Sequence, residues 1–162
     1  MFKTSHRENR IVAVSAERLF DVVADVERYP EFVPLMQQAT VVRLSARAYE
    51  TEQVLTLGLL VYRWRTHTEL DPPRSIHVTT ADPNFQHLLI RWSFAPEPDG
   101  RCRVGFELDC AVRWFWFKPL GDAVVARMAL TTVDAFVTRA RSLEAAERAL
   151  TTPPVASLPT PL

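Results

Sequence analysis

From residue 101 to residue 112, every second side chain is apolar, and Arg101, Arg103, Glu107 and Asp109 lie on the opposite face. Two earlier segments, 59–70 and 86–95, alternate in the same way. Such a period of two, with one polar face, is typical of antiparallel strands that are covered on one side and solvated on the other. The bulky side chains of the apolar faces include Tyr62, Trp64, Trp92, Phe94 and Phe106. The chain must therefore supply a second layer to cover them.

The segment 118–148 can supply that layer, because it has helical periodicity and no proline in its interior. At 1.5 Å per residue, about 30 residues reach about 45 Å, which is enough to cross a sheet. The stripe that would face the sheet consists of Leu120, Val124, Met128, Thr131, Thr132, Ala135, Phe136 and Leu143. The middle of this stripe is small and semi-polar. Two outcomes stay open: close packing against the rings of Trp64, Trp92 and Phe94, or a gap between helix and sheet.

The first part of the chain predicts a strand over 4–14 and a helix over 16–24 that Ser15 caps. The helix must end at the following turn, because prolines cannot continue it. This turn carries Tyr29, Pro30, Phe32 and Pro34. A rigid aromatic turn of this kind suits the lip of a pocket. Turn signals at 45–47, 71–74, 82–84 and 96–100 then divide the chain into a meander of six antiparallel strands.

The expected architecture is therefore an α+β fold, with a curved antiparallel sheet of about seven strands wrapped around a long C-terminal helix. Two short helices follow the first strand. We expect one domain over residues 1–150. The last twelve residues, 151–162, hold four prolines and predict a disordered tail.

The balance of charge counts against a strongly electrostatic nucleic-acid binder. Lys plus Arg and Asp plus Glu number 19 each, so the net charge is zero, and a DNA partner is not expected. Apolar runs fall short of the about 20 residues of a membrane span, and a signal peptide is not evident. Cys102 and Cys110, eight residues apart on one strand, are too distant to form a disulfide. These features favour a cytoplasmic protein.

Catalytic and metal-binding patterns are lacking. The four histidines, His6, His67, His77 and His87, do not have metal-ligand spacing on a helix, and no Cys-x-x-Cys motif occurs. The last three lie on the polar strand faces, where solvent exposure is expected. No acidic side chain is identified that points inward. We therefore expect a protein that is not an enzyme and requires no cofactor or metal, with a cyclase-like activity as the weaker alternative.

Three features keep two interpretations each. The inward aromatic residues either form plain core or line an apolar pocket, in which Tyr62, Thr66 and Thr68 could bind a polar head group. The run Trp114, Phe115, Trp116 and Phe117 is either buried or contacts a membrane or a partner protein. The arginines of the polar sheet face form either a salt-bridged surface or a modest basic patch for ribosomal RNA.

Several motifs resemble those of the coenzyme Q-binding START family, within the helix-grip superfamily. They span about residues 4–142 and consist of Ser15-Ala16-Glu17, the turn 25–34 with its YPEFVP sequence, Pro72-Pro73-Arg74-Ser75-Ile76, Phe85, Arg91-Trp92-Ser93-Phe94 and Asp134-Ala135-Phe136. Relatives include ribosome association toxins and polyketide cyclase/dehydrase-like proteins. The chain departs from the pattern at Leu35-Met36, where many relatives have Trp or Tyr and then Cys. It departs again at 82–85, where many have Gly-Pro-Phe.

The resemblance implies a helix-grip (START-like) fold and a hydrophobic small molecule, ubiquinone or another polyprenyl lipid, bound between sheet and long helix in support of respiratory quinone function. The expected ligand contacts are Tyr29, Pro30, Phe32, Pro34, Leu35, Tyr62, Trp64, Trp92, Phe94, Phe106, Met128, Thr132 and Phe136. The alternative is a toxin-like factor that binds the ribosome and blocks subunit joining. The expected location is the cytoplasm, with peripheral contact at the inner membrane.

Overall fold

The computed structural model describes residues 2–113 and 118–153, except for the side chains of residues 2, 57 and 118–125. The strands are β1 (Phe2–Val12), β2 (Met36–Ser45), β3 (Ala48–Leu57), β4 (Leu60–Asp71), β5 (Ser75–Thr79), β6 (Phe85–Pro96) and β7 (Cys102–Val112). The helices are α1 (Ala16–Ala24), the 3-10 helices η1 (Val26–Glu31) and η2 (Pro98–Gly100), and α2 (Lys118–Thr151).

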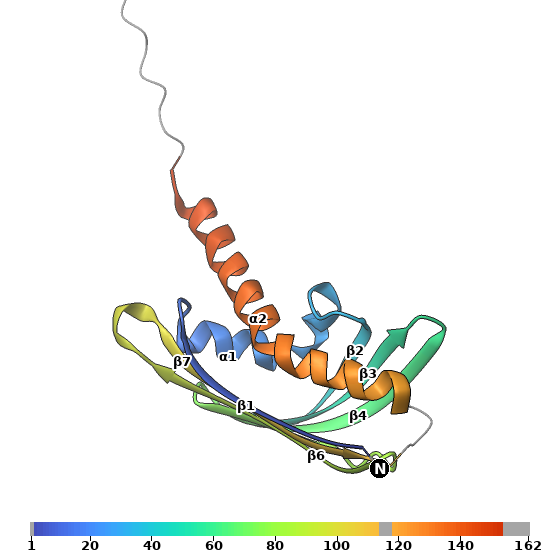
Figure 1. Ribbon diagram of the computed structural model, residues 1–162. Helices are drawn as coiled ribbons and strands as arrows, with labels where there is room; N and C mark the ends of the chain where they lie inside the picture. The colour runs from blue at the N-terminus through green and yellow to red at the C-terminus, as the bar shows by residue number, and fades with distance from the viewer. Residues whose placement is uncertain (1, 114–117, 154–162) are drawn as a thin grey trace, which may run out of the picture.

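The strands form one antiparallel sheet in the order β1-β7-β6-β5-β4-β3-β2. This order is a meander from β2 to β7, with β1 added beside the last strand. The sheet is curved, and α2 crosses its concave face while α1 lies beside the same face (Figure 1). The predicted α+β helix-grip architecture of about seven strands, two short helices and one long helix is confirmed.

The local signals explain the N-terminal elements. The Ser15 hydroxyl accepts a hydrogen bond from the Arg18 backbone N–H at 3.2 Å and so caps α1, which spans the predicted residues. The first strand, however, ends at Val12 and not at residue 14. The chain has to bend before Ser15 can cap the helix, and Val14 enters the core from that bend, where it is buried.

Strand register decides which side chains face the helix. Trp92 pairs with Phe106 and Leu88 pairs with Cys110, so the apolar positions of β6 and β7 share the concave face as predicted. His67, His77 and His87 lie on the opposite face. Both cysteines are buried on β7 and unpaired. The predicted alternation therefore produces a sheet with one apolar face.

The core is closed at the end next to α1. Phe20 of α1 meets Phe94 edge-to-face, with ring centroids 5.7 Å apart, and Phe94 stacks on Trp92. Further along α2, the Phe136 ring makes edge-to-face contacts with the rings of Tyr29, Phe32 and Trp92, at 5.0, 5.2 and 5.2 Å between centroids. Beyond Phe136, towards the start of α2, the space between helix and sheet is hollow.

Two sequence predictions fall outside the described residues. They are the membrane or partner contact of Trp114–Phe117 and most of the disordered tail, since the description stops at residue 153. The long helix continues to Thr151, three residues past its predicted end. Within the described part of the chain, no helix is both long and apolar enough to cross a membrane.

Candidate functional site

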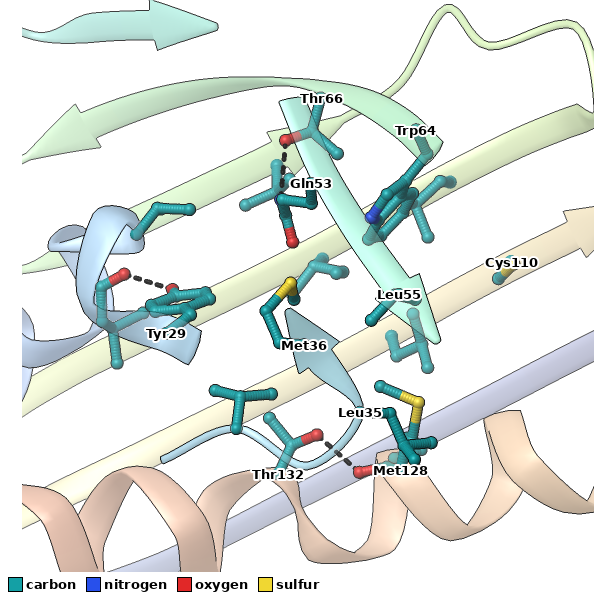
Figure 2. A pocket seen from close by; sticks show the side chains of 18 of the residues that line it. Tyr29, Leu35, Met36, Gln53, Leu55, Trp64, Thr66, Cys110, Met128 and Thr132 are labelled. Carbon is teal, nitrogen blue, oxygen red and sulfur yellow. Dashed lines mark hydrogen bonds between the residues drawn. The ribbon is translucent and has the colours of Figure 1, made fainter. Parts of the chain in front are cut away.

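A cavity of about 620 Å³ lies between the concave face of the sheet and α2. Its wall is built from η1 and the loop after it, the central strands, and the part of α2 that carries Ala129, Thr132 and Ala135. Figure 2 shows these elements around the hollow, with side chains from helix and strands turned towards it. Of the two outcomes left open for the small residues of α2, the structure has the gap.

Ten of the thirteen residues expected to contact a ligand line this cavity. They are Tyr29, Pro34, Leu35, Tyr62, Trp64, Trp92, Phe106, Met128, Thr132 and Phe136. Alternation along β4, β6 and β7 identified four of them, because residues two apart on a strand share a face, and the other six come from the aromatic turn and from the stripe of α2.

The other three lie outside the lining, for packing reasons. Phe94 is enclosed between Phe20 and Trp92 in the filled end of the core, so a ligand in the cavity has no access to it. The ring of Phe32 packs against Phe136 from the outside and lies 5.4 Å beneath the Arg139 guanidinium. Pro30 sits within η1 and shapes the turn without reaching the cavity.

Two tyrosine hydroxyls hold the end of α1 at the cavity wall. The Tyr29 hydroxyl donates to the Val23 carbonyl, and the Tyr49 hydroxyl donates to the Ala24 carbonyl at 2.8 Å. These carbonyls are among the last of α1 and have no partner within the helix. Tyr49 lies on β3 and therefore attaches to this strand the turn that contains Tyr29. The sequence analysis did not identify Tyr49 as a site residue.

Folding stability is expected to fall as pH rises from about 10 towards 12, and to fall less in Tyr49→Phe. Tyrosine ionises near pH 10 in an unfolded chain, whereas burial raises the pKa of Tyr49 to about 12. The folded protein keeps a proton that the unfolded chain releases, so the stabilisation present below pH 10 is lost across this window. Urea unfolding at about pH 9, 10 and 11 measures the effect. Equal losses in both proteins would contradict it.

A ladder of buried polar side chains crosses the sheet floor of the cavity. The hydroxyls of Thr51 and Thr66 are 2.6 Å apart, and the Gln53 amide nitrogen donates to them at 3.0 and 3.4 Å. All three residues are at most 6% exposed. Figure 2 shows the Gln53 side-chain oxygen on the side away from Thr66, facing the hollow. This oxygen is a hydrogen-bonding group inside an otherwise apolar wall.

Thr66 was expected as a head-group contact, but Thr51 and Gln53 were not. Their strand, β3, places Tyr49, Thr51, Gln53 and Leu55 on the concave face. Because Thr51 and Gln53 are polar, β3 lacks the alternation of apolar and polar residues that predicts which face of a strand is buried. Only the strand register identifies them.

The lip of the cavity has an unusual backbone at Leu35. This residue has φ of +68°, a conformation that favours glycine, and its side chain is 42% exposed. The Leu35 carbonyl accepts a hydrogen bond from the Thr56 N–H at 2.9 Å, which ties the lip to the end of β3. Leu35 and Met128 of α2 both line the cavity (Figure 2). The departure from the family pattern at Leu35-Met36 thus falls at the opening.

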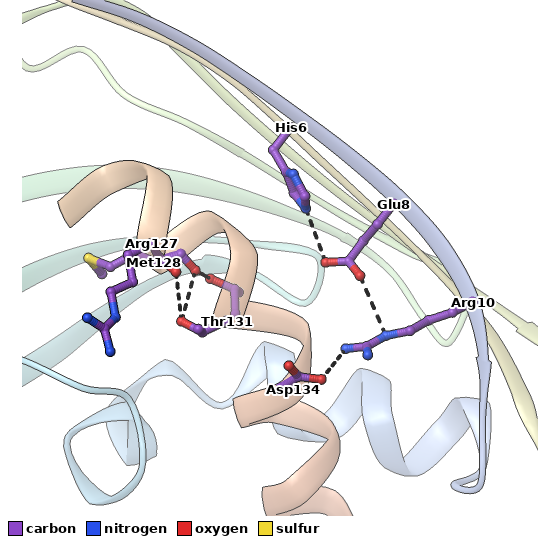
Figure 3. Close-up of polar contacts among 8 residues, drawn as sticks. His6, Glu8, Arg10, Arg127, Met128, Thr131 and Asp134 are labelled. Carbon is purple, nitrogen blue, oxygen red and sulfur yellow. Dashed lines mark hydrogen bonds and ion pairs between the residues drawn. The ribbon is translucent and has the colours of Figure 1, made fainter. Parts of the chain in front are cut away.

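The expectation that no acidic side chain points inward is wrong. Glu8 of β1 pairs with Phe106, so it faces the concave side. It belongs to a chain of contacts from His6 through Glu8 and Arg10 to Asp134 of α2, with steps of 3.2, 3.5 and 2.7 Å (Figure 3). These groups do not line the cavity. They tie the edge strand to the helix, and the pattern of β1 gave no sign of it because its polar residues occupy both faces.

The electrostatics of the cavity are nearly neutral. Arg127 is the one charged residue that the structure places in its described lining, and it is exposed. Burial raises the pKa of Tyr62 to about 12 and that of the Cys110 thiol to about 11, so both groups stay protonated at neutral pH. Among the described residues, no group of three His, Cys, Asp or Glu side chains could hold a metal ion.

The outer face of the sheet is rich in ion pairs. Arg63 and Arg65 both contact Glu52, at 2.8 and 3.1 Å. Glu107 likewise contacts Arg7 at 2.7 Å and Arg91 at 3.7 Å, which lowers the pKa of this carboxyl. The salt-bridged interpretation therefore describes most of this face. Glu52 and Glu107 each pair with two arginines.

Comparison with known proteins agrees with this architecture. The chain is similar to the ribosome association toxin RatA of Pseudomonas aeruginosa, with 29% identity over 140 residues, or 86% of this chain and 97% of that protein. It is also similar to the mitochondrial coenzyme Q-binding protein COQ10 homolog B of Xenopus laevis, with 29% identity over 110 residues, or 64% of this chain and 44% of that protein.

Solved structures show the same fold. The aromatase/cyclase Zhui from Streptomyces sp. R1128 has a TM-score of 0.74 at 17% identity, with 86% of this chain and 94% of that chain covered. The resemblance based on the turn at 25–34 and its companion motifs is thereby confirmed. A protein-family model described as "Polyketide cyclase / dehydrase and lipid transport" matches residues 12–137. The chain belongs to this polyketide cyclase/dehydrase and lipid transport family.

Proposed function

We propose that this protein binds a neutral hydrophobic molecule, a ubiquinone or another polyprenyl lipid, between the sheet and α2. The observation that carries the proposal is the cavity of about 620 Å³ with its largely apolar wall. Small-molecule sites are typically about 300–1,000 Å³, mostly apolar, with a few polar groups that fix orientation. The similarity to coenzyme Q-binding proteins supports a quinone as the ligand.

Burial of apolar surface would drive binding. Each Å² removed from water contributes about 25 cal/mol, so a ligand that buries about 200 Å² gains about 5 kcal/mol before the cost of its immobilisation. The tyrosines that hold η1 and the rings around Phe136 fix the wall before the ligand arrives. This preorganisation keeps the cost of ordering the site low.

The polar ladder favours a neutral head group. A hydroxyl on the ligand can donate to the Gln53 side-chain oxygen, and a carbonyl can accept from the amide nitrogen after the amide turns. A buried carboxylate would need a cation, and the described lining offers only the exposed Arg127. Quinones and hydroquinones therefore suit the site better than fatty acids.

Replacing Gln53 with leucine is expected to weaken the binding of a ubiquinone analogue about two- to tenfold, the effect of one lost hydrogen bond. An isoprenoid hydrocarbon without a head group should bind both proteins equally. Fluorescence titration of both ligands measures the difference. The matched control is Gln38→Leu on the exposed face of β2. A loss of affinity for the hydrocarbon as well would indicate a damaged wall and contradict a head-group role.

The same lining gives no support to a catalytic role. General acid–base chemistry needs a titratable side chain beside the substrate. The part of the wall that the structure describes holds no carboxylate, histidine or lysine, and its titratable groups Tyr62 and Cys110 stay protonated at neutral pH because burial raises their pKa. The proposed role is therefore binding and release.

Native mass spectrometry of protein purified without detergent tests the main proposal. A co-purified quinone or polyprenyl lipid is the expected result. Protein that is consistently empty, and that fails to bind added quinone in titration, would rule the proposal out.

Ribosome association is a second candidate, because the similarity to RatA extends over 97% of that protein. On the outer face, Arg63 and Arg65 share Glu52, and Arg7 and Arg91 share Glu107, so these two carboxylates each have two arginine partners that RNA phosphates could also contact. Cosedimentation with the large ribosomal subunit in a sucrose gradient at low salt tests this candidate. Absence from the subunit fraction would exclude it.

A further inference from the structure

The hairpin between β3 and β4 ends in large apolar side chains that the core does not use. Leu59 is fully exposed, Leu60 is 43% exposed and Val61 is 61% exposed. Exposing three consecutive apolar residues is costly unless they meet an apolar partner. We call residues 59–61 the hairpin tip.

The hairpin tip is continuous with the opening of the cavity. Val61 pairs with Thr56, whose N–H donates to the carbonyl of Leu35 at the lip. Along β4, residue 60 shares the concave face with Tyr62 and Trp64, and these two line the cavity. An apolar path therefore leads from the exposed tip into the site.

Two exposed arginines lie near the cavity. Arg127 lies in the cavity wall, and the backbone N–H of Arg113 donates to the carbonyl of Asn84, another lining residue. Both arginines are exposed, and the structure gives neither an ion-pair partner among the residues that it describes. Asp82 is an acidic group on this side, and its carboxylate accepts a hydrogen bond from the Tyr62 hydroxyl at 3.4 Å. An apolar tip, together with two exposed arginines near the cavity that have no ion-pair partner among the described residues, complements the interface of an anionic bilayer.

The size of the tip argues against a protein partner. Stable protein interfaces bury about 800 Å² on each side, far more than three side chains provide. A bilayer requires no matching surface, since a few apolar side chains inserted among the lipids are enough when cationic residues add to them.

We propose that this end of the protein docks on an anionic lipid bilayer. Residues 59–61 and Leu35 enter the interface, while Arg113 and Arg127 contact lipid headgroups. A ligand then passes between bilayer and cavity without crossing water. The docking itself does not depend on the proposed ligand; the direct transfer rests on the proposed function.

Vesicle cosedimentation of the full chain tests the docking. The wild-type protein is expected to bind vesicles of phosphatidylcholine with phosphatidylglycerol at least tenfold more tightly than vesicles of phosphatidylcholine alone, with the difference reduced by salt. Leu59→Asp should lower binding to the anionic vesicles at least tenfold. The matched control is Leu44→Asp, at a 53% exposed position near the other end of β2, which should bind as the wild type does.

Two outcomes would overturn the docking proposal: wild-type protein that stays in the supernatant with anionic vesicles, or Leu59→Asp that binds them as tightly as the wild type. A dimer in size-exclusion chromatography that Leu59→Asp abolishes would assign the tip to a second copy instead. Titration of a water-soluble short-chain quinone in the absence of vesicles is the separate measurement of ligand binding. Its failure would count against the proposed function and leave the docking result standing.

Discussion

Replacing Thr132 with tryptophan is expected to abolish ligand binding while the protein stays folded. Thr132 lies on α2 with its side chain in the cavity wall, and its hydroxyl donates only to the Met128 carbonyl one turn earlier (Figure 2). Losing that local bond costs little. The indole would occupy the hollow that the ligand needs, so affinity for a ubiquinone analogue should fall at least ~30-fold, or about 2 kcal/mol.

The experiment pairs titration with thermal unfolding of the same samples. Ala145→Trp is the matched control, because Ala145 is exposed on the same helix and does not line the cavity. Its affinity should equal that of the wild type. If Thr132→Trp keeps its melting temperature and still binds the quinone normally, the ligand does not occupy this cavity. A variant that has lost its cooperative transition would be replaced by Ala135→Phe, which fills the same hollow with a smaller ring.

The layers of the fold could be predicted because each has its own period. Alternation over 86–95 and 101–112 defines strands whose apolar residues share a face, and the segment after residue 118 has the period of a helix long enough to cover them. Local chemistry also placed α1, since Ser15 and the prolines of the turn mark its ends. The same alternation then placed Trp64, Trp92 and Phe106 on the cavity wall.

The polar part of the site was beyond such a pattern. Gln53 and Thr51 face inward at positions where alternation predicts apolar side chains, and they are tolerated because they bond to each other and to Thr66. Glu8 faces inward for a comparable reason, since Arg10 and His6 contact it. An inward polar residue can be predicted only when the side chain that forms its hydrogen bond or ion pair is known, and the sequence pattern does not show which side chain that is.

The difference between Phe94 and Trp64 shows a second limit. Both are inward aromatic residues on the sheet, yet Phe94 is sealed by Phe20 of α1 and Trp64 borders the hollow, where it stacks on Phe85. Which end of the groove is filled depends on where α1 packs. The position of α1 is set by tertiary contacts, so it cannot be predicted from the periodicity of the strands that carry Phe94 and Trp64.

Phe136→Ala is expected to cost about 3–5 kcal/mol of the free energy of unfolding, the range typical of a buried phenylalanine cut to alanine. The ring is 5% exposed and touches Tyr29, Phe32 and Trp92, so its loss removes contacts between α2, η1 and the sheet at once. Each aromatic pair adds about 0.5–1.5 kcal/mol beyond the area that it buries. The gap left behind would open into the existing cavity, which limits the collapse that could otherwise offset the cost.

Urea unfolding followed by circular dichroism measures the loss, with two controls. Phe136→Leu keeps most of the volume and loses mainly the ring contacts, so we expect a smaller cost of about 1–2 kcal/mol. Leu150→Ala, at a position on the same helix that is 87% exposed, should change stability by less than about 0.5 kcal/mol. If Phe136→Ala lowered the free energy of unfolding no more than Phe136→Leu does, the packing of α2 on the sheet would not depend on this ring. The cavity would then have a movable wall, and the preorganisation assumed for ligand binding would be absent.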